Sequence, residues 1–142
     1  MADQIQTDDL RRFNATRCPS GHTTLWEGLA ILVALRNWEY LIDQHTSFEI
    51  RADSFAALLA LQKGSSRTPG LNKIMSEIAL MEAERGLKFL TLTHILGLLN
   101  TWPDALSRHE APEPKVIPPA LLTEPGTSCE PRDRLFWRTE KQ

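Results

Sequence analysis

The spacing of apolar and polar residues predicts helices along most of the chain between residues 22 and 108 and strands at two short places. Leu25, Leu29 and Leu32 recur at helical spacing, and apolar residues on adjoining faces predict a first helix that other structure covers. Thr24 and Glu27 stand three residues apart at its start. This is the spacing of a capping box, in which each side chain caps a backbone N–H group.

The segments 48–52 and 87–92 have the short alternating or apolar pattern of strands. Helical patterns or start signals mark three more segments: 54–62, 71–85 and a short stretch from about Pro103. Asp53 is predicted to cap the first of these three helices, and Gly86 to end the second. Because helices separate the two strands, the order helix–strand–helix–helix–strand–helix predicts a parallel sheet and the α/β class.

The composition is that of one ordinary globular domain, with 142 residues, 42% apolar and 24% charged. Its 16 basic and 18 acidic side chains leave a net charge of -2, which excludes a strong single-sign field. Cys18 and Cys129 are too few for a disulfide framework and lack the pairing of a metal site. No signal peptide or long apolar run is visible, so we expect an intracellular protein, cytoplasmic or nuclear, with no membrane partner.

The prolines divide the chain, since seven of the nine fall at or after position 103. Residues 1–21 are predicted to be a lead-in, 22–108 the packed domain, and 109–142 a proline-rich extended tail that is mostly unpacked. The tail contains one aromatic and basic cluster, at 136–138. We expect it to belong to a loosely packed terminus, with a short docking motif as the alternative.

A family resemblance rests on three blocks of sequence. His94, Asn100 and Asp104 are spaced by six and then four residues, within a segment that runs His-Ile-x-Gly, Asn and Asp-Ala-Leu-Ser-Arg. Trp26 and Glu27 lead into the apolar helix, and Ile-Arg-Ala-Asp-Ser follows at 50–54. With these blocks in this order, residues 24–108 resemble the ribonuclease H domain of reverse-transcriptase polyproteins from gypsy-class retroelements.

The resemblance implies a partial ribonuclease H-like α/β fold. The family's N-terminal antiparallel strands, with its first catalytic aspartate, have no counterpart here, so the chain is expected to be N-terminally truncated relative to the family. Asp8 and Asp9 resemble a connector before the first helix and are poor substitutes for that aspartate. The missing strands would leave the 48–52 strand with an open edge, from which we expect marginal stability or self-association.

Enzymes of this family hold two Mg²⁺ ions between carboxylates and cut the RNA strand of an RNA–DNA hybrid. Hard divalent ions prefer oxygen ligands, and two of them can stabilise both the attacking water and the leaving oxygen. The resemblance implies that Glu27, Asp53 and Asp104 are the catalytic metal ligands. His94 would be an auxiliary catalytic group, Asn100 would bind nucleic acid, and the partner domain would be the reverse transcriptase of the same polyprotein.

Plainer interpretations remain open for each of these side chains. Glu27 and Asp53 have the positions of helix-capping residues, and Asp104 is ordinary acid enrichment in a first helical turn. Lys63 and Arg67 surround a Gly-Ser-Ser loop that either cradles a phosphate or is simply solvated. The alternative function is a catalytically inactive fragment that binds nucleic acid or protein, or that has no function.

Overall fold

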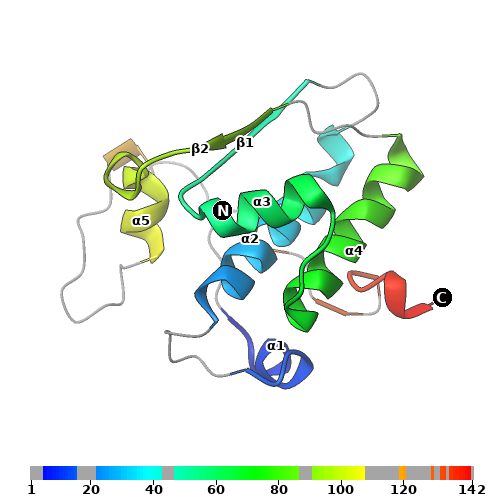
Figure 1. Cartoon of the computed structure of the whole chain (residues 1–142). Helices are drawn as coiled ribbons and strands as arrows, with labels where there is room; N and C mark the ends of the chain where they lie inside the picture. Colours follow the sequence, from blue (N-terminus) through cyan, green and yellow to red (C-terminus); the bar gives the residue numbers. More distant parts are fainter. Residues whose placement is uncertain are drawn as a thin grey trace.

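The computed structural model describes residues 5–15, 22–42, 47–86, 91–107, 119–120, 129, 132–133 and 135–141. Over these residues the protein is mixed α/β, mostly helical, with one small two-stranded sheet (Figure 1). The expected α/β class and the order of the six predicted elements are confirmed. In the described part of the chain, none of the helices has the length and apolar content that a membrane crossing requires.

The structure adds several short elements that the pattern did not predict. The α-helices are α1 (Thr7–Arg12), α2 (Thr23–Asn37), α3 (Phe55–Lys63), α4 (Pro69–Arg85) and α5 (Thr101–Ser107). The strands are β1 (Glu49–Ala52) and β2 (Thr91–His94), and the 3-10 helices are η1 (Glu39–Leu41), η2 (Gly97–Leu99) and η3 (Thr139–Lys141). The second strand ends two residues later than predicted, and its expected start at 87–90 lies outside the described residues.

The two strands form the parallel sheet that the helical crossover predicted. Ile50 lies opposite Leu92 and Ala52 opposite His94. One further hydrogen bond continues the ladder, because the Ile95 N–H donates to the Ala52 carbonyl at 3.0 Å. Helices α2, α3 and α4 gather on one side of the sheet, and α5 lies near the ends at which both strands finish (Figure 1).

The core lies between α2 and α4, where Leu29 and Leu32 pack with Ile74 and Ile78. The two helices approach closely at Gly28. A Cβ atom at that position would lie 2.5 Å from the Leu71 side chain, which is closer than real Cβ contacts. The absence of a side chain at Gly28 therefore allows the close packing of α4 against α2.

Two predicted helix caps are wrong. Helix α2 begins after His22 with no side-chain cap, so Thr24 lies inside the first turn and forms no capping box with Glu27. At α3 the cap is Ser54, which has extended backbone geometry and accepts a hydrogen bond from the Ala57 N–H at 3.3 Å. The carboxylates of Glu27 and Asp53 are therefore not used to cap these helices.

The expectation of a loosely packed terminus is also wrong for the aromatic cluster of the tail. Phe136 and Trp137 belong to the core, and Trp137 is only 1% exposed. The Trp137 ring makes edge-to-face contacts with Phe13 and Phe136, and the guanidinium of Arg12 lies 4.6 Å from its ring centroid. One apolar partner of Trp137, Phe13, comes from the lead-in, which composition alone excluded from the packed domain.

Two buried carboxylates attach this segment to the helices. Glu77 pairs with Arg36 at 2.8 Å and accepts the backbone N–H groups of Arg138 and Thr139 at 3.0 and 2.8 Å. Asp9 accepts the Arg132 guanidinium through both oxygens, at 2.7 to 3.0 Å. We refer to the described residues from 132 to 141 as the C-terminal clasp, since they join α1 to α2 and α4.

Candidate functional site

A cavity of about 670 Å³ extends along α2, η1 and β1 to the residues at the start of α5. Most of its wall is apolar, with Ile31 and Ala34 from α2 among the lining residues. Its polar lining residues include Glu27, Asp53 and Asn100. Three of the predicted site residues, from three separate parts of the chain, therefore line one cavity.

Glu27 and Asp53 interact through their charges. Burial raises the pKa of Glu27 above its ordinary value, and the nearby negative charge of Asp53 raises it further. Asp53 comes directly after β1, at the carboxyl edge of the sheet, where ligand sites of α/β proteins gather. Two carboxylates held close together in this way form a local negative potential that a cation would relieve.

His94 and Gly97 bring the end of β2 beside Asp53. The Nε2 atom of His94 lies 3.2 Å from the Asp53 carbonyl oxygen, to which it can donate, and its ring contacts Phe55 edge to face. A Cβ atom at Gly97 would lie 3.8 Å from an oxygen of the Asp53 carboxylate. Nothing in the residue pattern gave Gly97 a role, although its place in the His-Ile-x-Gly block was a signal for one.

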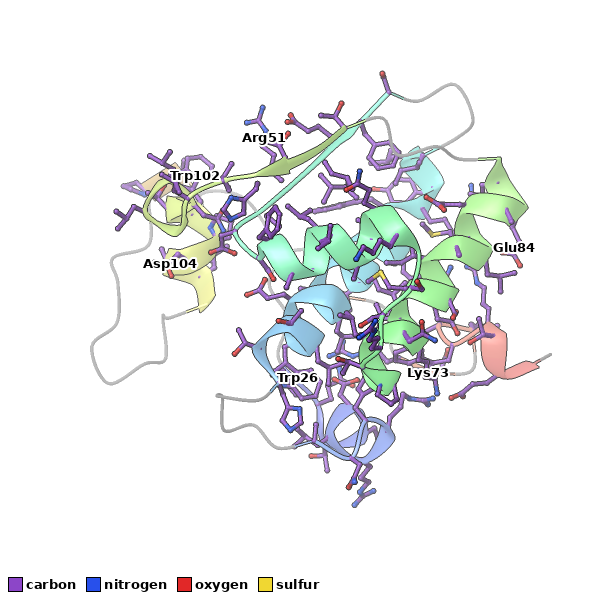
Figure 2. The ribbon with its side chains drawn as sticks, in the orientation of Figure 1. Trp26, Arg51, Lys73, Glu84, Trp102 and Asp104 are labelled. Atoms are coloured by element: carbon purple, nitrogen blue, oxygen red, sulfur yellow. The ribbon has the colours of Figure 1, made fainter. Side chains whose placement is uncertain are left out.

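Asp104 lies on α5, four residues after Asn100, whose carbonyl accepts its N–H at 3.1 Å (Figure 2). Within the described residues, no three His, Cys, Asp or Glu side chains come together closely enough to hold a metal ion. The donor chemistry of Glu27 and Asp53 fits a hard divalent cation, since both supply carboxylate oxygens. Asp104 does not join them in this arrangement.

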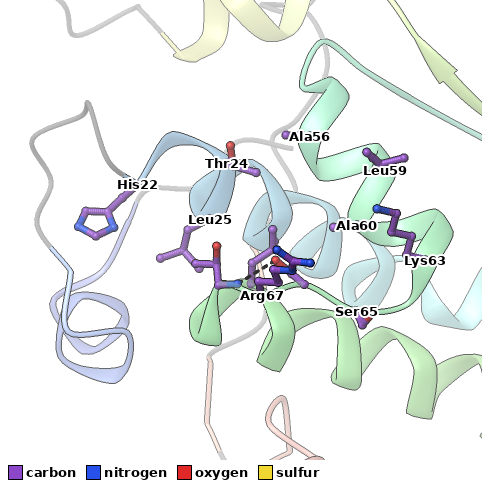
Figure 3. A pocket seen from close by; sticks show the side chains of 12 residues that line it. His22, Thr24, Leu25, Ala56, Leu59, Ala60, Lys63, Ser65 and Arg67 are labelled. Carbon is purple, nitrogen blue, oxygen red and sulfur yellow. Dashed lines mark hydrogen bonds between the residues drawn. The ribbon is translucent and has the colours of Figure 1, made fainter.

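Lys63 and Arg67 lie around a different cavity, also of about 670 Å³, between the start of α2, helix α3 and the 65–68 loop (Figure 3). Serine and threonine side chains share its wall with these two basic residues. The loop is held by hydrogen bonds from the Thr68 N–H to the Ser66 hydroxyl and from the Ser66 N–H to Asn72. Phosphate binding by Lys63 and Arg67 stays a prediction.

No protein-family model, curated protein or solved structure matches the chain. The chemistry of the two cavities is therefore argued from their residues and geometry.

Replacing Glu27 with Gln is expected to raise the free energy of unfolding at pH 7, because it removes a charge that the folded protein disfavours. The folded protein raises the pKa of Glu27, so its protonated form is favoured, and the associated stability is lost as the pH rises through that pKa. Urea denaturation of both proteins between pH 4 and pH 8 measures the difference. The difference in stability should vanish as the pH falls towards 4.5, the ordinary pKa of a glutamate.

Glu49→Gln is the control, because its expected change in the free energy of unfolding at pH 7 has the opposite sign. Hydrogen bonds from Thr93 and Arg51 lower the pKa of Glu49, so its contribution to stability is lost as the pH falls. If Glu27→Gln destabilised the protein at pH 7, the carboxylate would be a supporting element of the fold, and its assignment to an electrostatically unfavourable site would be wrong.

Proposed function

We propose that this chain is a ribonuclease H-like domain of a retroelement polyprotein that hydrolyses the RNA strand of RNA–DNA hybrids with Mg²⁺. One observation carries the proposal. Glu27 and Asp53 come from a helix and a strand end, neither caps a helix, and both line the same cavity. Carboxylates brought together at a cost to folding stability are typical of functional sites.

The arrangement of the elements supports the same proposal. A long helix precedes a strand, two helices cross over, and a second parallel strand leads into a short helix that bears Asp104. The resemblance places its matched blocks on these elements in this order. Both the carboxylate pair and Asn100 lie where the parallel strands end, which is the usual place for a ligand in such folds.

In this function, Glu27, Asp53 and Asp104 would hold Mg²⁺, which stabilises the charge that develops on the attacking water and the leaving oxygen. His94 is exposed and held against the Asp53 backbone, so it would be the auxiliary group beside the carboxylates. Asn100 would contact the nucleic-acid strand. RNA would be recognised through its 2′-hydroxyls and backbone shape, and the reverse-transcriptase domain would be the partner.

Cleavage of a labelled RNA–DNA hybrid in the presence of Mg²⁺ or Mn²⁺ tests the proposal. We expect Asp53→Asn and Glu27→Gln each to lower the cleavage rate at least about 100-fold, because a direct metal ligand contributes no less than its supporting groups. The matched control is Asp8→Asn, which changes an exposed acid on α1 away from the cavity. No cleavage by the wild-type protein, or equal cleavage by Asp53→Asn, overturns the enzymatic function.

The second candidate is a non-catalytic module that binds nucleic acid or protein. The observation that favours it is that Asp104 does not gather with Glu27 and Asp53 among the described residues. Hybrid binding that weakens with rising salt, without cleavage, would support this candidate. The same labelled hybrid therefore separates the two functions.

A further inference from the structure

Strand β1 has a free edge in the described part of the chain, since the sheet contains only β1 and β2. The Ala52 carbonyl accepts a hydrogen bond from Ile95, which follows β2, so the backbone groups of Ala52 and Ile50 face β2. Backbone groups alternate in direction along a strand. The N–H and C=O groups of Glu49 and Arg51 therefore face the free edge.

The free edge borders the apolar part of the cavity that Glu27 and Asp53 line. This part is lined by Ala34 of α2, by Trp38 between α2 and η1, and by Leu41 of η1, and β1 adds Ile50. Trp38 and Leu41 remain 42% and 60% exposed. Unpaired backbone groups beside an exposed apolar surface favour the addition of another strand.

The charges of β1 indicate which strand is added. The Glu49 and Arg51 side chains are exposed and pair with each other at 2.8 Å, with Arg51 directed away from the helices (Figure 2). We propose that a second copy of this chain pairs its β1 antiparallel to this β1, with Ile50 opposite Ile50 of the copy. In this register Glu49 of each chain lies opposite Arg51 of the other.

Neighbouring registers do not give this match. Centring the pair on Glu49 or on Arg51 places two like charges directly opposite each other, which is destabilising. In the proposed register the edge-facing groups of Glu49 and Arg51 form the hydrogen-bonded pairs. The Ile50 side chains, on the other face of the strands, then meet over the apolar part of the cavity. This association does not depend on whether the protein cleaves a hybrid.

Charge reversal tests the pairing by sedimentation equilibrium. We expect Glu49→Arg and Arg51→Glu, each alone, to raise the dimer dissociation constant at least about tenfold, because each places like charges opposite across the interface. An equimolar mixture of the two variants should associate at least as tightly as the wild type. The double variant Glu49→Arg/Arg51→Glu should dimerise like the wild type, since it keeps the complementarity with the signs exchanged.

Circular dichroism of each variant establishes that it is folded. A wild-type chain that stays monomeric up to about 1 mM, single variants that dimerise like the wild type, or a mixture that fails to associate would each overturn the proposal. If a single variant does not fold, the dimer dissociation constant of the double variant tests the proposed register instead. A dimer of wild-type affinity supports the proposed register, and a tenfold weaker one contradicts it.

Discussion

Replacing Trp137 with Ala is expected to lower the free energy of unfolding by about 3–5 kcal/mol. The indole is almost completely buried, packs against Phe13 and Phe136, and lies beneath the guanidinium of Arg12. Its removal leaves a cavity at the junction of the clasp with α1. Urea denaturation followed by far-ultraviolet circular dichroism measures the change.

Leu135→Ala is the matched control, because Leu135 belongs to the same clasp and is 70% exposed. Its effect should stay within about 0.5 kcal/mol of zero. If Trp137→Ala behaved like this control, the clasp would contribute nothing to the folded state and the tail would be unpacked, as the proline content first indicated.

Glu77→Ala is expected to destabilise the protein by about 3–5 kcal/mol, because it leaves the guanidinium of Arg36 buried without its counter-charge. The side chains of this pair are 0% and 3% exposed. The substitution also removes the acceptor of the Arg138 and Thr139 backbone N–H groups, so the clasp loses two of its hydrogen bonds to α4. Denaturation in guanidinium chloride, with the midpoint and slope both fitted, reports the loss.

A double variant separates the charge from the packing. Glu77→Met combined with Arg36→Met replaces both buried charges with apolar groups, so it should be closer in stability to the wild type than Glu77→Ala is. Equal destabilisation of the two proteins would assign the effect of Glu77→Ala to the lost clasp hydrogen bonds. It would then be unrelated to the uncompensated charge of Arg36.

The order of the helices and strands could be predicted from the sequence because hydrophobic periodicity is a local property. The position of Gly86 also gave a local signal, and the structure has it in a left-handed conformation at the end of α4. The start of this helix was predicted two residues too late, since α4 begins at Pro69. The residues that cap the helices could not be predicted from such local signals. Asp53 and Ser54 are adjacent and both suit a cap, and only the backbone conformation selects Ser54.

The clasp could not be predicted, because its partners are distant in sequence. Arg132 and Asp9 are separated by 123 residues, and Arg138 and Glu39 by 99. Composition described the proline-rich stretch as a whole and gave no weight to Phe136 and Trp137. A pattern of two aromatic residues carries no period from which a buried face can be inferred.

The candidate site was predicted in part. The strand-end position of Asp53 and the resemblance both favoured its association with Glu27, and the structure brings the two together with Asn100. The resemblance also places Asp104 with them, and the role of Asp104 stays a prediction. Residue spacing fixes which element carries a carboxylate, whereas the distance between carboxylates on different elements depends on the whole tertiary structure.

The clasp also has a consequence for the order in which the chain folds during synthesis. Asp9 and Phe13 leave the ribosome well before Arg132 and Trp137, which complete their surroundings, since Arg132 follows Asp9 by 123 residues. Domains acquire stable packing only when their distant contacts can close, so α1 lacks its Arg132 partner until then, although Phe13 at its end already contacts Trp26. Nascent chains halted before residue 132 should therefore expose α1 to proteases and chaperones, even though α2, α3 and α4 are already complete.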